Sequence, residues 1–432
     1  MAPVLRPGDL VTVTPEKPAA GGRMIARHDG LVLLVAGAIP GEPARVRVDR
    51  VERSLAYASV EQVLEPHPAR RGVTIDPRSG GAVYAHIAYP EQRRLKGEII
   101  ADALRRLARI EPPADIDVTA SPELGYRMRA RVHVRDHRIG FFLEQTHQIC
   151  DVRDSGQLLP ETATTLDQLA AALGGAGLAG GAEIEVSENR SADQRALHIE
   201  LLQGARLVQA SRLGPLPGVT GLSWSPHGSS ADRVAFGTPF VDDVLDQVGD
   251  PPGAVPGGVR LRRHVKAFFQ GNRFLLDQLV GAVLGACPAG PVLELYSGAG
   301  LFGVSLAATG RHRVIVVEGH PASASDLRVN AEPYGEAIDV HHTSVERFVE
   351  EAPRHQRGTL VLDPPRSGMS REAMTGILGL GADRVVLVSC DVATFARDVR
   401  RFVDKGYRLT TIRGFDLFPT TAHVEVFAVL DR

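Results

Sequence analysis

The chain has 432 residues, of which 44% are hydrophobic and 23% charged, with a formal net charge of −2 at pH 7. A chain of this length is too long to form a single ordinary hydrophobic core. The composition is that of a globular protein. No apolar run approaches a length of about 20 residues, which is what a helix needs to cross a bilayer. Because the first residues carry neither a basic nor an apolar leader, we expect a cytoplasmic protein with no membrane partner.

The N-terminal segment, residues 1–64, predicts a small β-barrel of the OB kind. Short apolar or alternating runs are separated by Gly and Pro turns. Closely spaced short strands of this sort are typical of such barrels. The expected strands cover residues 10–13, 31–35, 44–48 and 56–60.

Arginines gather on one of these strands. The alternating residues are Arg45, Arg47, Arg50 and Arg53, a basic stripe that is either a solvated strand face or a nucleic-acid surface. The stretch 21–30, G-G-R-M-I-A-R-H-D-G, followed by P-G-E at 40–42, resembles the TRAM domain, an RNA-binding barrel attached to tRNA- and rRNA-modifying enzymes. The resemblance implies that Arg45 and Arg47 bind RNA.

The middle of the chain, residues 65–255, predicts a separate domain without a catalytic motif. A linker rich in Pro, Gly and Arg covers 66–81, and helical spacing runs over 89–109 until two prolines stop it. Beyond residue 140 we expect short strands and two glycine-rich loops, at 174–181 and 249–258.

One predicted strand of this middle segment is basic along a single face. Arg127, Arg129 and Arg131 alternate along it. Because like charges on one strand face repel, a phosphate-contacting surface explains the pattern better than a lone surface strand. The scattered histidines fit solvated or structural roles, and we expect no metal site; they are His133, His137 and His147.

The last third is organised around residues 291–303, P-V-L-E-L-Y-S-G-A-G-L-F-G. A buried strand, a glycine turn and a helix start form the first half of a mononucleotide-binding unit. The next apolar run ends in Glu318, an acid placed to bind a ribose diol. A dinucleotide and S-adenosylmethionine both fit this stretch. Glu294 in the first strand favours the methyl donor, because an acid there opposes a pyrophosphate but suits an amine.

Three further reactive groups lie at strand ends. Asp363 follows a buried strand over 359–362, and Cys390 lies between a strand at 384–388 and a helix at 393–402. The helix dipole at that position predicts a lowered thiol pKa. Glu425 enters an otherwise apolar final strand, where a carboxylate is costly unless it has a partner or a task. Ligands of open α/β sheets bind outside the carboxyl ends of the strands, so we expect these groups in one crevice.

Four motifs of this part, L-E-L-Y-S-G-A-G, D-P-P-R-S-G, V-S-C-D and F-P-T-T-A-H-V-E, stand in the order and spacing of a known family. They resemble those of the RNA uridine-5-methyltransferases, the family of the tRNA ribothymidine enzyme and its 23S rRNA relatives. The resemblance implies an α/β protein with an N-terminal TRAM barrel, a central α+β domain and a Rossmann-like methyltransferase sheet over 256–432. It also implies that the helix at about 89–112 packs on the catalytic domain, and that the substrate is tRNA or rRNA. No obligate protein partner is evident.

The resemblance also implies a reaction. Carbon 5 of uracil becomes nucleophilic only when a group adds at carbon 6, which is the role of the Cys390 thiolate, and Glu425 then removes the carbon-5 proton. The uridine must be flipped out or lie in a loop. The donor S-adenosylmethionine is expected at Gln270, in the motif F-F-Q-G-N, and at Tyr296, Ser297, Gly298, Gly300, Glu318, Ser344 and Asp363.

The sequence departs from the family at a few positions. Several relatives carry an iron–sulfur cluster on four cysteines, and the corresponding positions are Val73, Ser79, Ala82 and Ser155, so we expect no cluster. Asp391-Val392 replaces the family's Asn-Pro after the nucleophile, and Leu301 replaces an asparagine of the glycine turn. These changes leave the reaction intact but put the target in doubt.

Two alternative functions fit part of the sequence. An NAD-dependent oxidoreductase would use the same glycine turn, but it leaves Cys390 and Glu425 unexplained. A non-catalytic RNA-binding protein with a degenerate methyltransferase fold would have no reason to keep Glu318, Asp363, Cys390 and Glu425 together. The three cysteines are too few and too far apart for a disulfide scaffold; they are Cys150, Cys287 and Cys390.

Overall fold

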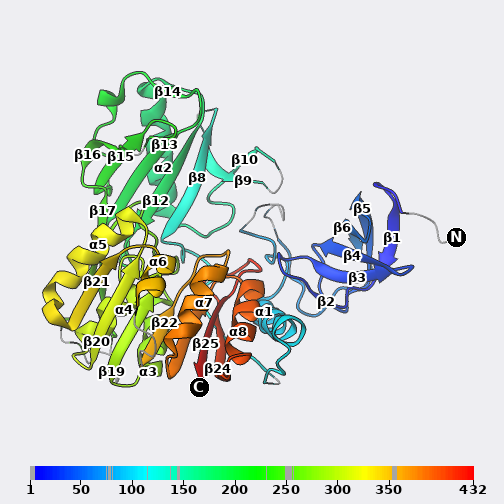
Figure 1. Ribbon diagram of the computed structural model, residues 1–432. Helices are drawn as coiled ribbons and strands as arrows, with labels where there is room; N and C mark the ends of the chain where they lie inside the picture. Colours follow the sequence, from blue (N-terminus) through cyan, green and yellow to red (C-terminus); the bar gives the residue numbers. More distant parts are fainter. Residues whose placement is uncertain are drawn as a thin grey trace.

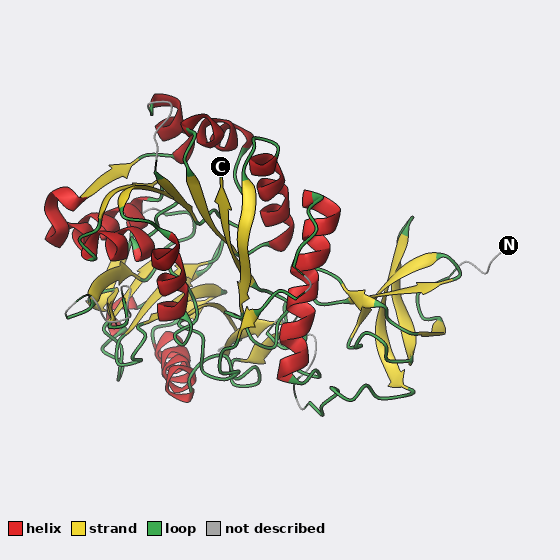
Figure 2. Ribbon diagram, turned by 90° about the horizontal axis from the view of Figure 1, so that it is seen from below, coloured by secondary structure: helices red, strands yellow, loops and turns green. Residues whose placement is uncertain are grey.

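The computed structural model describes residues 5–73, 75, 79, 81–113, 115–136, 138–143, 146–229, 231–248, 255, 257–352 and 358–432. These residues form three large sheets and two small ribbons (Figures 1 and 2). His137 and most of the loop at 249–258 lie outside the described residues. None of the helices in the described ranges combines the length and apolar character that a membrane span requires.

The N-terminal barrel is one six-stranded sheet in the order β1-β5-β6-β4-β3-β2. Because β1 also contacts β3, the sheet curls around a core that includes Met24, Leu33 and Val46. The four expected strands are confirmed, and β2 and β3 are additional. The strands are β1 (Leu10–Val13), β2 (Lys17–Pro18), β3 (Met24–His28), β4 (Leu31–Ala36), β5 (Ala44–Val51) and β6 (Leu55–Val63).

The central sheet has seven strands in the order β10-β9-β8-β12-β13-β15-β16. Helix α2 (Pro160–Gly175), which we did not expect, packs Leu166, Leu169 and Leu173 against one face of it. The strands are β8 (Arg129–Arg135), β9 (Arg138–Phe142), β10 (Ile149–Asp151), β12 (Ala182–Glu188), β13 (Arg195–Leu201), β15 (Gly221–Ser225) and β16 (Arg233–Gly237). Two ribbons flank it, β11 (Leu178–Ala179) with β14 (Arg206–Leu207), and β17 (Phe240–Leu245) with β18 (Val259–His264).

The third sheet has the order β21-β20-β19-β22-β23-β25-β24-β7. Strand β25 runs antiparallel to both neighbours, and the other neighbouring pairs are parallel. The expected strands are confirmed within one or two residues at their ends. The strands are β7 (Val118–Thr119), β19 (Gly290–Leu295), β20 (His312–Glu318), β21 (Ile338–His342), β22 (Thr359–Leu362), β23 (Arg384–Ser389), β24 (Arg408–Phe415) and β25 (Glu425–Asp431).

Both faces of this third sheet are apolar, as expected of a sheet covered by helices on both sides. One face packs against α3, α4 and α5, and the other against α1, α6, α7 and α8. The helices are α1 (Tyr89–Ala103), α3 (Leu276–Ala286), α4 (Leu301–Ala308), α5 (Pro321–Ala331), α6 (Val345–Glu351), α7 (Arg371–Leu380) and α8 (Val392–Val403).

Residues that precede the central sheet in sequence complete the third sheet. Strand β7 pairs with β24, and α1 contacts α8. Helix α1 continues as a π-helical turn over Leu104–Ala108 and ends at Arg109, whose φ of 55° is left-handed. In Figures 1 and 2 the helix lies between the barrel and the third sheet. The domain limits at residues 64 and 255 stay a prediction.

Candidate active site

A cavity of about 580 Å³ lies where strands β19, β20, β22 and β23 end and β25 begins. It brings together most of the expected site residues, namely Arg127, Arg129, Gln270, Tyr296, Gly298, Glu318, Asp363, Cys390 and Glu425. Other residues of its wall were not predicted from the sequence, among them Lys266, Phe268, Arg366 and Phe418. Phe268, Arg366 and Phe418 belong to the motifs already quoted, and Phe268 is 56% exposed, which is unusual for a large aromatic side chain.

The glycine turn after β19 depends on left-handed backbone. Gly300 has a φ of 96° and begins α4. A Cβ atom there would lie 2.6 Å from the Val304 side chain and 2.7 Å from that of Leu327. Tyr296 also has a positive φ, of 66°, and it lines the cavity wall. Glycine at position 300 is therefore required both by the backbone conformation and by the close packing of α4 and α5 against the turn.

Glu318 is fixed by the turn that it faces. Its carboxylate accepts hydrogen bonds from the Gly298 amide at 2.7 Å and from the His320 amide at 2.5 Å. Each oxygen of a carboxylate has two lone pairs, so both oxygens can still accept a bond from a ligand hydroxyl. The arrangement holds an acceptor pair at the cavity wall, which suits a ribose diol.

Ser297, Gly300 and Ser344 lie outside the cavity wall. The Ser297 hydroxyl donates to the Glu294 carbonyl at 3.2 Å and accepts from the Val317 amide at 3.1 Å, so it joins the ends of β19 and β20. Ser344 caps α6 by accepting from the Arg347 amide at 3.3 Å. Their expected places at the donor site stay a prediction that these contacts do not support.

Glu294 lies beneath the glycine turn and does not line the cavity. Its side chain is fully buried, and a Cβ atom on Gly303 would collide with its carboxylate. Burial, helped by the charge of Asp363, raises the pKa of Glu294 to about 8. The Glu294 carboxyl group therefore packs beneath the glycine turn. Because it does not line the cavity, it is not placed for the expected direct contact with an amine of the donor.

Asp363 and Gln270 meet across the cavity. The Gln270 amide donates to the Asp363 carboxylate at 3.0 Å. Burial raises the pKa of Asp363 to about 7, and the hydrogen bond from Gln270 opposes that rise. The pair offers an amide and a carboxyl group, both able to donate or accept, to a planar polar ligand.

The expectation of a low thiol pKa at Cys390 is wrong. Burial raises the pKa of the Cys390 thiol to about 12, and the carboxylates of Glu425 and Asp363 raise it further. Arg366 lowers it, but by less. The N-terminus of α8 is occupied by the Asp391 carboxylate, which accepts from the Thr394 amide at 2.8 Å. The Asp391 carboxylate, rather than the thiol, therefore binds an amide at this end of α8.

The same contact accounts for one departure from the family pattern. Asp391 caps α8, and asparagine is about as good a cap as aspartate, so the exchange keeps the local structure. Leu301, the other departure, is buried in the core between α4 and the third sheet.

The basic strand divides into two parts. Arg127 and Arg129 line the cavity, whereas Arg131 lies opposite Glu185 on β12 and pairs with it at 2.5 Å. The imidazole of His133 lies 3.5 Å from the Glu183 carboxylate. Acidic residues on β12 therefore compensate the charge of Arg131 on β8. Repulsion between like charges, on which the predicted phosphate-contacting surface rested, does not apply to this part of the strand.

Arg45, Arg47 and Arg50 are exposed on β5, as expected, and Arg53 is exposed in the bend that follows this strand. Arg47 pairs with Glu61, and Arg50 pairs with Glu52 at 3.0 Å. The stripe is therefore partly neutralised, and its role in RNA binding stays a prediction.

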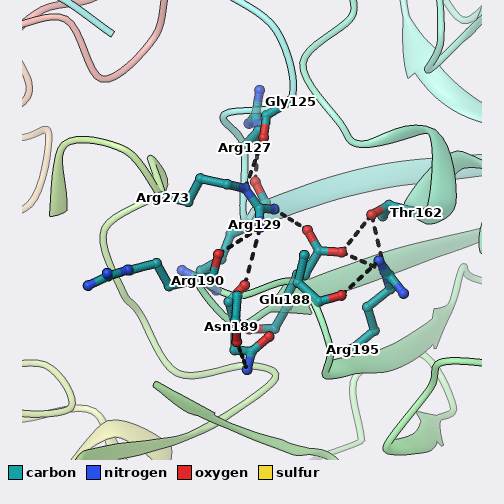
Figure 3. A network of polar contacts seen from close by, with 12 residues as sticks. Gly125, Arg127, Arg129, Thr162, Glu188, Asn189, Arg190, Arg195 and Arg273 are labelled. Carbon is teal, nitrogen blue, oxygen red and sulfur yellow. Dashed lines mark hydrogen bonds and ion pairs between the residues drawn. The ribbon is translucent and has the colours of Figure 1, made fainter. Parts of the chain in front are cut away.

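A buried ionic network holds the segment that carries Gln270. Figure 3 shows Glu188, at the end of β12, between Arg273 and Arg195. The Arg195 guanidinium lies 2.5 Å from the carboxylate, and the Thr162 hydroxyl donates to it at 2.7 Å. Arg273 also donates to the Gly125 carbonyl at 2.9 Å. Because each buried charge has partners, the network fixes the central sheet against the segment that carries Gln270.

The positions that correspond to the family's cluster cysteines carry no thiol in this chain. Ser79, Ala82 and Ser155 are buried, and Val73 is exposed. Across the described ranges, no group of three or more His, Cys, Asp or Glu side chains is placed to hold a metal ion.

The fold and the site define a class. A mostly parallel sheet with one reversed strand, a glycine turn after β19 and an acid at the end of β20 are the features of a Rossmann-like methyltransferase that uses S-adenosylmethionine. The residues present fit this donor, since Glu318 offers paired acceptors for a ribose and the cavity is large enough for a nucleoside.

Comparison with known proteins identifies the family. Residues 229–432 match the tRNA (Uracil-5-)-methyltransferase family, and residues 6–60 match the TRAM domain. A 23S rRNA (uracil(1939)-C(5))-methyltransferase of Pseudomonas putida is 31% identical over 96% of this chain and 92% of its own length. An RNA methyltransferase of Streptomyces coelicolor is 31% identical over 99% of this chain and 94% of its own length. The chain belongs to the S-adenosylmethionine-dependent RNA uracil-5-methyltransferase family.

A solved structure supports the fold. The tRNA (uracil-54, C5)-methyltransferase of Pyrococcus abyssi, crystallised with S-adenosyl-L-homocysteine, superposes with a TM-score of 0.73. The match covers 97% of this chain and all of that one at 22% identity. The TRAM barrel, the central α+β sheet and the methyltransferase sheet expected from the sequence are thus confirmed as the fold.

Proposed function

We propose that the protein methylates carbon 5 of one uridine in structured RNA through a covalent adduct with Cys390. The observation that carries the proposal is the convergence of Cys390 and Glu425 on the cavity that also holds Glu318 and Asp363. A dehydrogenase would have no use for the thiol or for a carboxylate buried in an apolar strand.

The donor is held by the glycine turn and its acid. Glu318 would bind the ribose, with the backbone of Tyr296 and Gly298 beside it, and Asp363 with Gln270 would lie next to the adenine or the methionyl end. When bound, S-adenosylmethionine supplies an electrophilic methyl group. The chain's own residues provide everything that prepares the uracil to receive it.

Cys390 begins the reaction on the base. The thiol gives its proton to solvent water, the sulfur bonds to carbon 6, and the electrons of the carbon 5–carbon 6 double bond move onto the carbon-4 oxygen as an enolate, which makes carbon 5 nucleophilic. Arg366 is the cation that opposes the raised pKa of the Cys390 thiol, and it also lowers that of Glu425. Its charge therefore favours the thiolate when the uridine enters.

Glu425 completes the reaction. Burial and the charge of Asp363 raise the pKa of Glu425 well above the usual range, so its carboxylate, once ionised, is a stronger base than an exposed one. It takes the proton from carbon 5 after methylation, the double bond re-forms, and the bond from carbon 6 to Cys390 breaks. The thiolate is then free for another cycle.

The target is a uridine of rRNA or tRNA that a loop presents. The similarity to the Pseudomonas putida enzyme makes 23S rRNA the first substrate to test. We expect the purified protein to transfer labelled methyl groups to rRNA or tRNA and to yield 5-methyluridine on nucleoside analysis. Failure to form 5-methyluridine in either RNA would contradict the proposed function.

Glu318→Ala should weaken the binding of S-adenosylhomocysteine by about 1–3 kcal/mol, because the ligand loses hydrogen bonds to a charged acceptor. Titration calorimetry measures the change. Asp339→Ala is the matched control, since this exposed acid lies on the neighbouring strand β21 and outside the cavity wall. Equal affinity of the Glu318 variant and the wild type would remove Glu318 from the donor site.

Replacing Arg45 and Arg47 by methionine should weaken RNA binding and lower the slope of its salt dependence by about one for each phosphate that the protein no longer neutralises. Replacing Arg127 and Arg129 should do the same near the cavity. Arg347→Met, on the exposed side of α6, is the control. A slope equal to that of the wild type would mean that these arginines contact no phosphate of the RNA.

The enzyme should work without an iron–sulfur cluster, because Val73, Ser79, Ala82 and Ser155 supply no thiolate. Protein purified without oxygen is expected to be colourless and to contain far less iron than protein. Stoichiometric iron with the absorbance of a cluster would overturn the expectation.

A further inference from the structure

The loop between β24 and β25 carries two parts of the cavity wall. Phe418 lies within the loop, and Glu425 is its last residue and the first of β25. The sheet itself fixes only the two ends of this loop, through the pairing of Phe415 with Glu425. Asn272 donates to the Leu417 carbonyl at 3.1 Å, and most of the other side chains that hold the middle of the loop come from the N-terminal part of the chain.

Two buried residues of α1 bind the loop directly. Gln92 accepts a hydrogen bond from the Thr420 amide at 2.9 Å, and Lys96 donates to the Asp416 carboxylate at 2.5 Å and to the Phe418 carbonyl at 3.0 Å. Both side chains are fully buried. The amide of Gln92 donates to the carbonyls of Tyr84 at 3.1 Å and Ile87 at 2.9 Å, so every polar atom of the side chain is engaged.

The segment before α1 binds the same loop. The Tyr84 amide donates to the Thr420 carbonyl at 2.8 Å, and the Thr420 hydroxyl donates to the Gly81 carbonyl at 2.7 Å. Thr420 has a φ of 63°, a left-handed conformation that a β-branched residue adopts only when its surroundings enforce it. The loop therefore depends on these contacts for its shape.

The barrel shares this packing. Tyr84, Ile87 and Leu95 of α1 and its preceding segment belong to the hydrophobic core of the barrel, and Ala422 of the loop packs against that core. Lys17 of β2 pairs with Asp102 of α1 at 2.6 Å. Barrel, α1 and catalytic loop thus form one continuous contact surface.

We infer that Gln92 and Lys96 are positioning residues for the catalytic loop, and that the barrel and α1 are part of the active-site scaffold as well as an RNA-binding module. The inference rests on the proposed role of Glu425 as the base. A base acts only within hydrogen-bond reach of its proton. Glu425 is the residue at which the loop joins β25, so a displaced loop shifts this end of the strand and slows proton removal. Cys390 and the glycine turn follow other strands, β23 and β19, and are left in place.

Displacement of the catalytic loop predicts a kinetic signature that a general loss of protein stability would not produce. Gln92→Met is close in size and removes the hydrogen bond to Thr420. In a single turnover it should transfer methyl groups to RNA at a rate within about threefold of the wild type, because addition and transfer precede proton removal. The covalent enzyme–RNA adduct should then decay about 10- to 100-fold more slowly, the size of effect that a misplaced catalytic group has.

Arg94→Met is the matched control, since Arg94 lies on the exposed side of the same helix and pairs with Glu91 and Glu98. It should release the adduct like the wild type. The double variant Lys96→Met with Asp416→Asn tests the second pair of residues without leaving a buried charge unpaired, and it should also prolong the adduct. If Gln92→Met does not fold, as judged by binding of S-adenosylhomocysteine, this double variant decides.

Glu425→Gln, assayed in parallel, separates the inferred positioning role of Gln92 and Lys96 from the proposed role of Glu425 as the base. If it traps the adduct while the folded α1 variants release RNA at the wild-type rate, α1 is only structural and the inference is wrong. The inference is equally wrong if those variants lose methyl transfer and adduct release in proportion. If Glu425→Gln forms no adduct, the assignment of the base fails and the inference fails with it.

Discussion

Cys390→Ala is expected to abolish methyl transfer to RNA, with a fall of at least about 10⁴-fold in single-turnover rate. The physical reason is that carbon 5 of uracil does not attack a methyl sulfonium until a nucleophile has added at carbon 6. Among the residues that the structure describes, Cys390 carries the only thiol on the cavity wall. Incorporation of a labelled methyl group into RNA measures the effect.

Two control variants accompany this experiment. Cys287→Ala and Cys150→Ala should retain methyl transfer, because neither cysteine lines the cavity. The Cys390 variant itself should bind S-adenosylhomocysteine like the wild type, since the glycine turn and Glu318 are unchanged. If Cys390→Ala methylates RNA at a rate comparable with the controls, the nucleophile is wrongly assigned.

Glu425→Gln is expected to have the second large effect, a fall of about 10²- to 10⁴-fold in turnover, the usual contribution of a general base. Gln is nearly isosteric, so the side chain, which is 1% exposed, can be replaced without leaving a cavity. Addition and methyl transfer remain, but the carbon-5 proton stays and elimination stops. The enzyme should therefore remain bound to methylated RNA, as a slowly migrating band on a denaturing gel.

The matched control for this band is the double variant Cys390→Ala with Glu425→Gln. It keeps the altered carboxyl position but lacks the sulfur, so it should give no band. Normal turnover of the single variant, without a trapped species, would show that another group removes the proton.

The ends of the strands could be predicted well from the sequence because all parallel strands of a sheet end at the same edge. Apolar runs such as 359–362 are buried on both faces, and whatever follows them lies at one edge. This placed Asp363, Cys390 and Glu318 in a single cavity. Helix α2 was not predicted, although Leu166, Leu169 and Leu173 have helical spacing, since only short strands and glycine-rich loops were expected beyond residue 140.

Properties that depend on distant residues could not be predicted in this way. The predicted pKa of Cys390 was wrong because the helix that follows the thiol is not the main influence on it. Burial of the thiol raises the pKa most, and the carboxylates that raise it further come from β25 and the end of β22. The hydrogen bond between Gln92 and Thr420 joins segments at opposite ends of the chain, and no periodicity indicates it. The acidic partners of Arg131 lie on another strand for the same reason.

The central claim, that Cys390 forms the adduct and Glu425 resolves it, is tested most directly by mass spectrometry of the trapped species. The Glu425→Gln enzyme is incubated with RNA and S-adenosylmethionine, then digested with protease and nuclease. The expected product is a peptide containing Cys390 that carries one 5-methylated uridine nucleotide. A nucleotide attached to a different residue, an adduct without the added methyl group, or no adduct at all would contradict it.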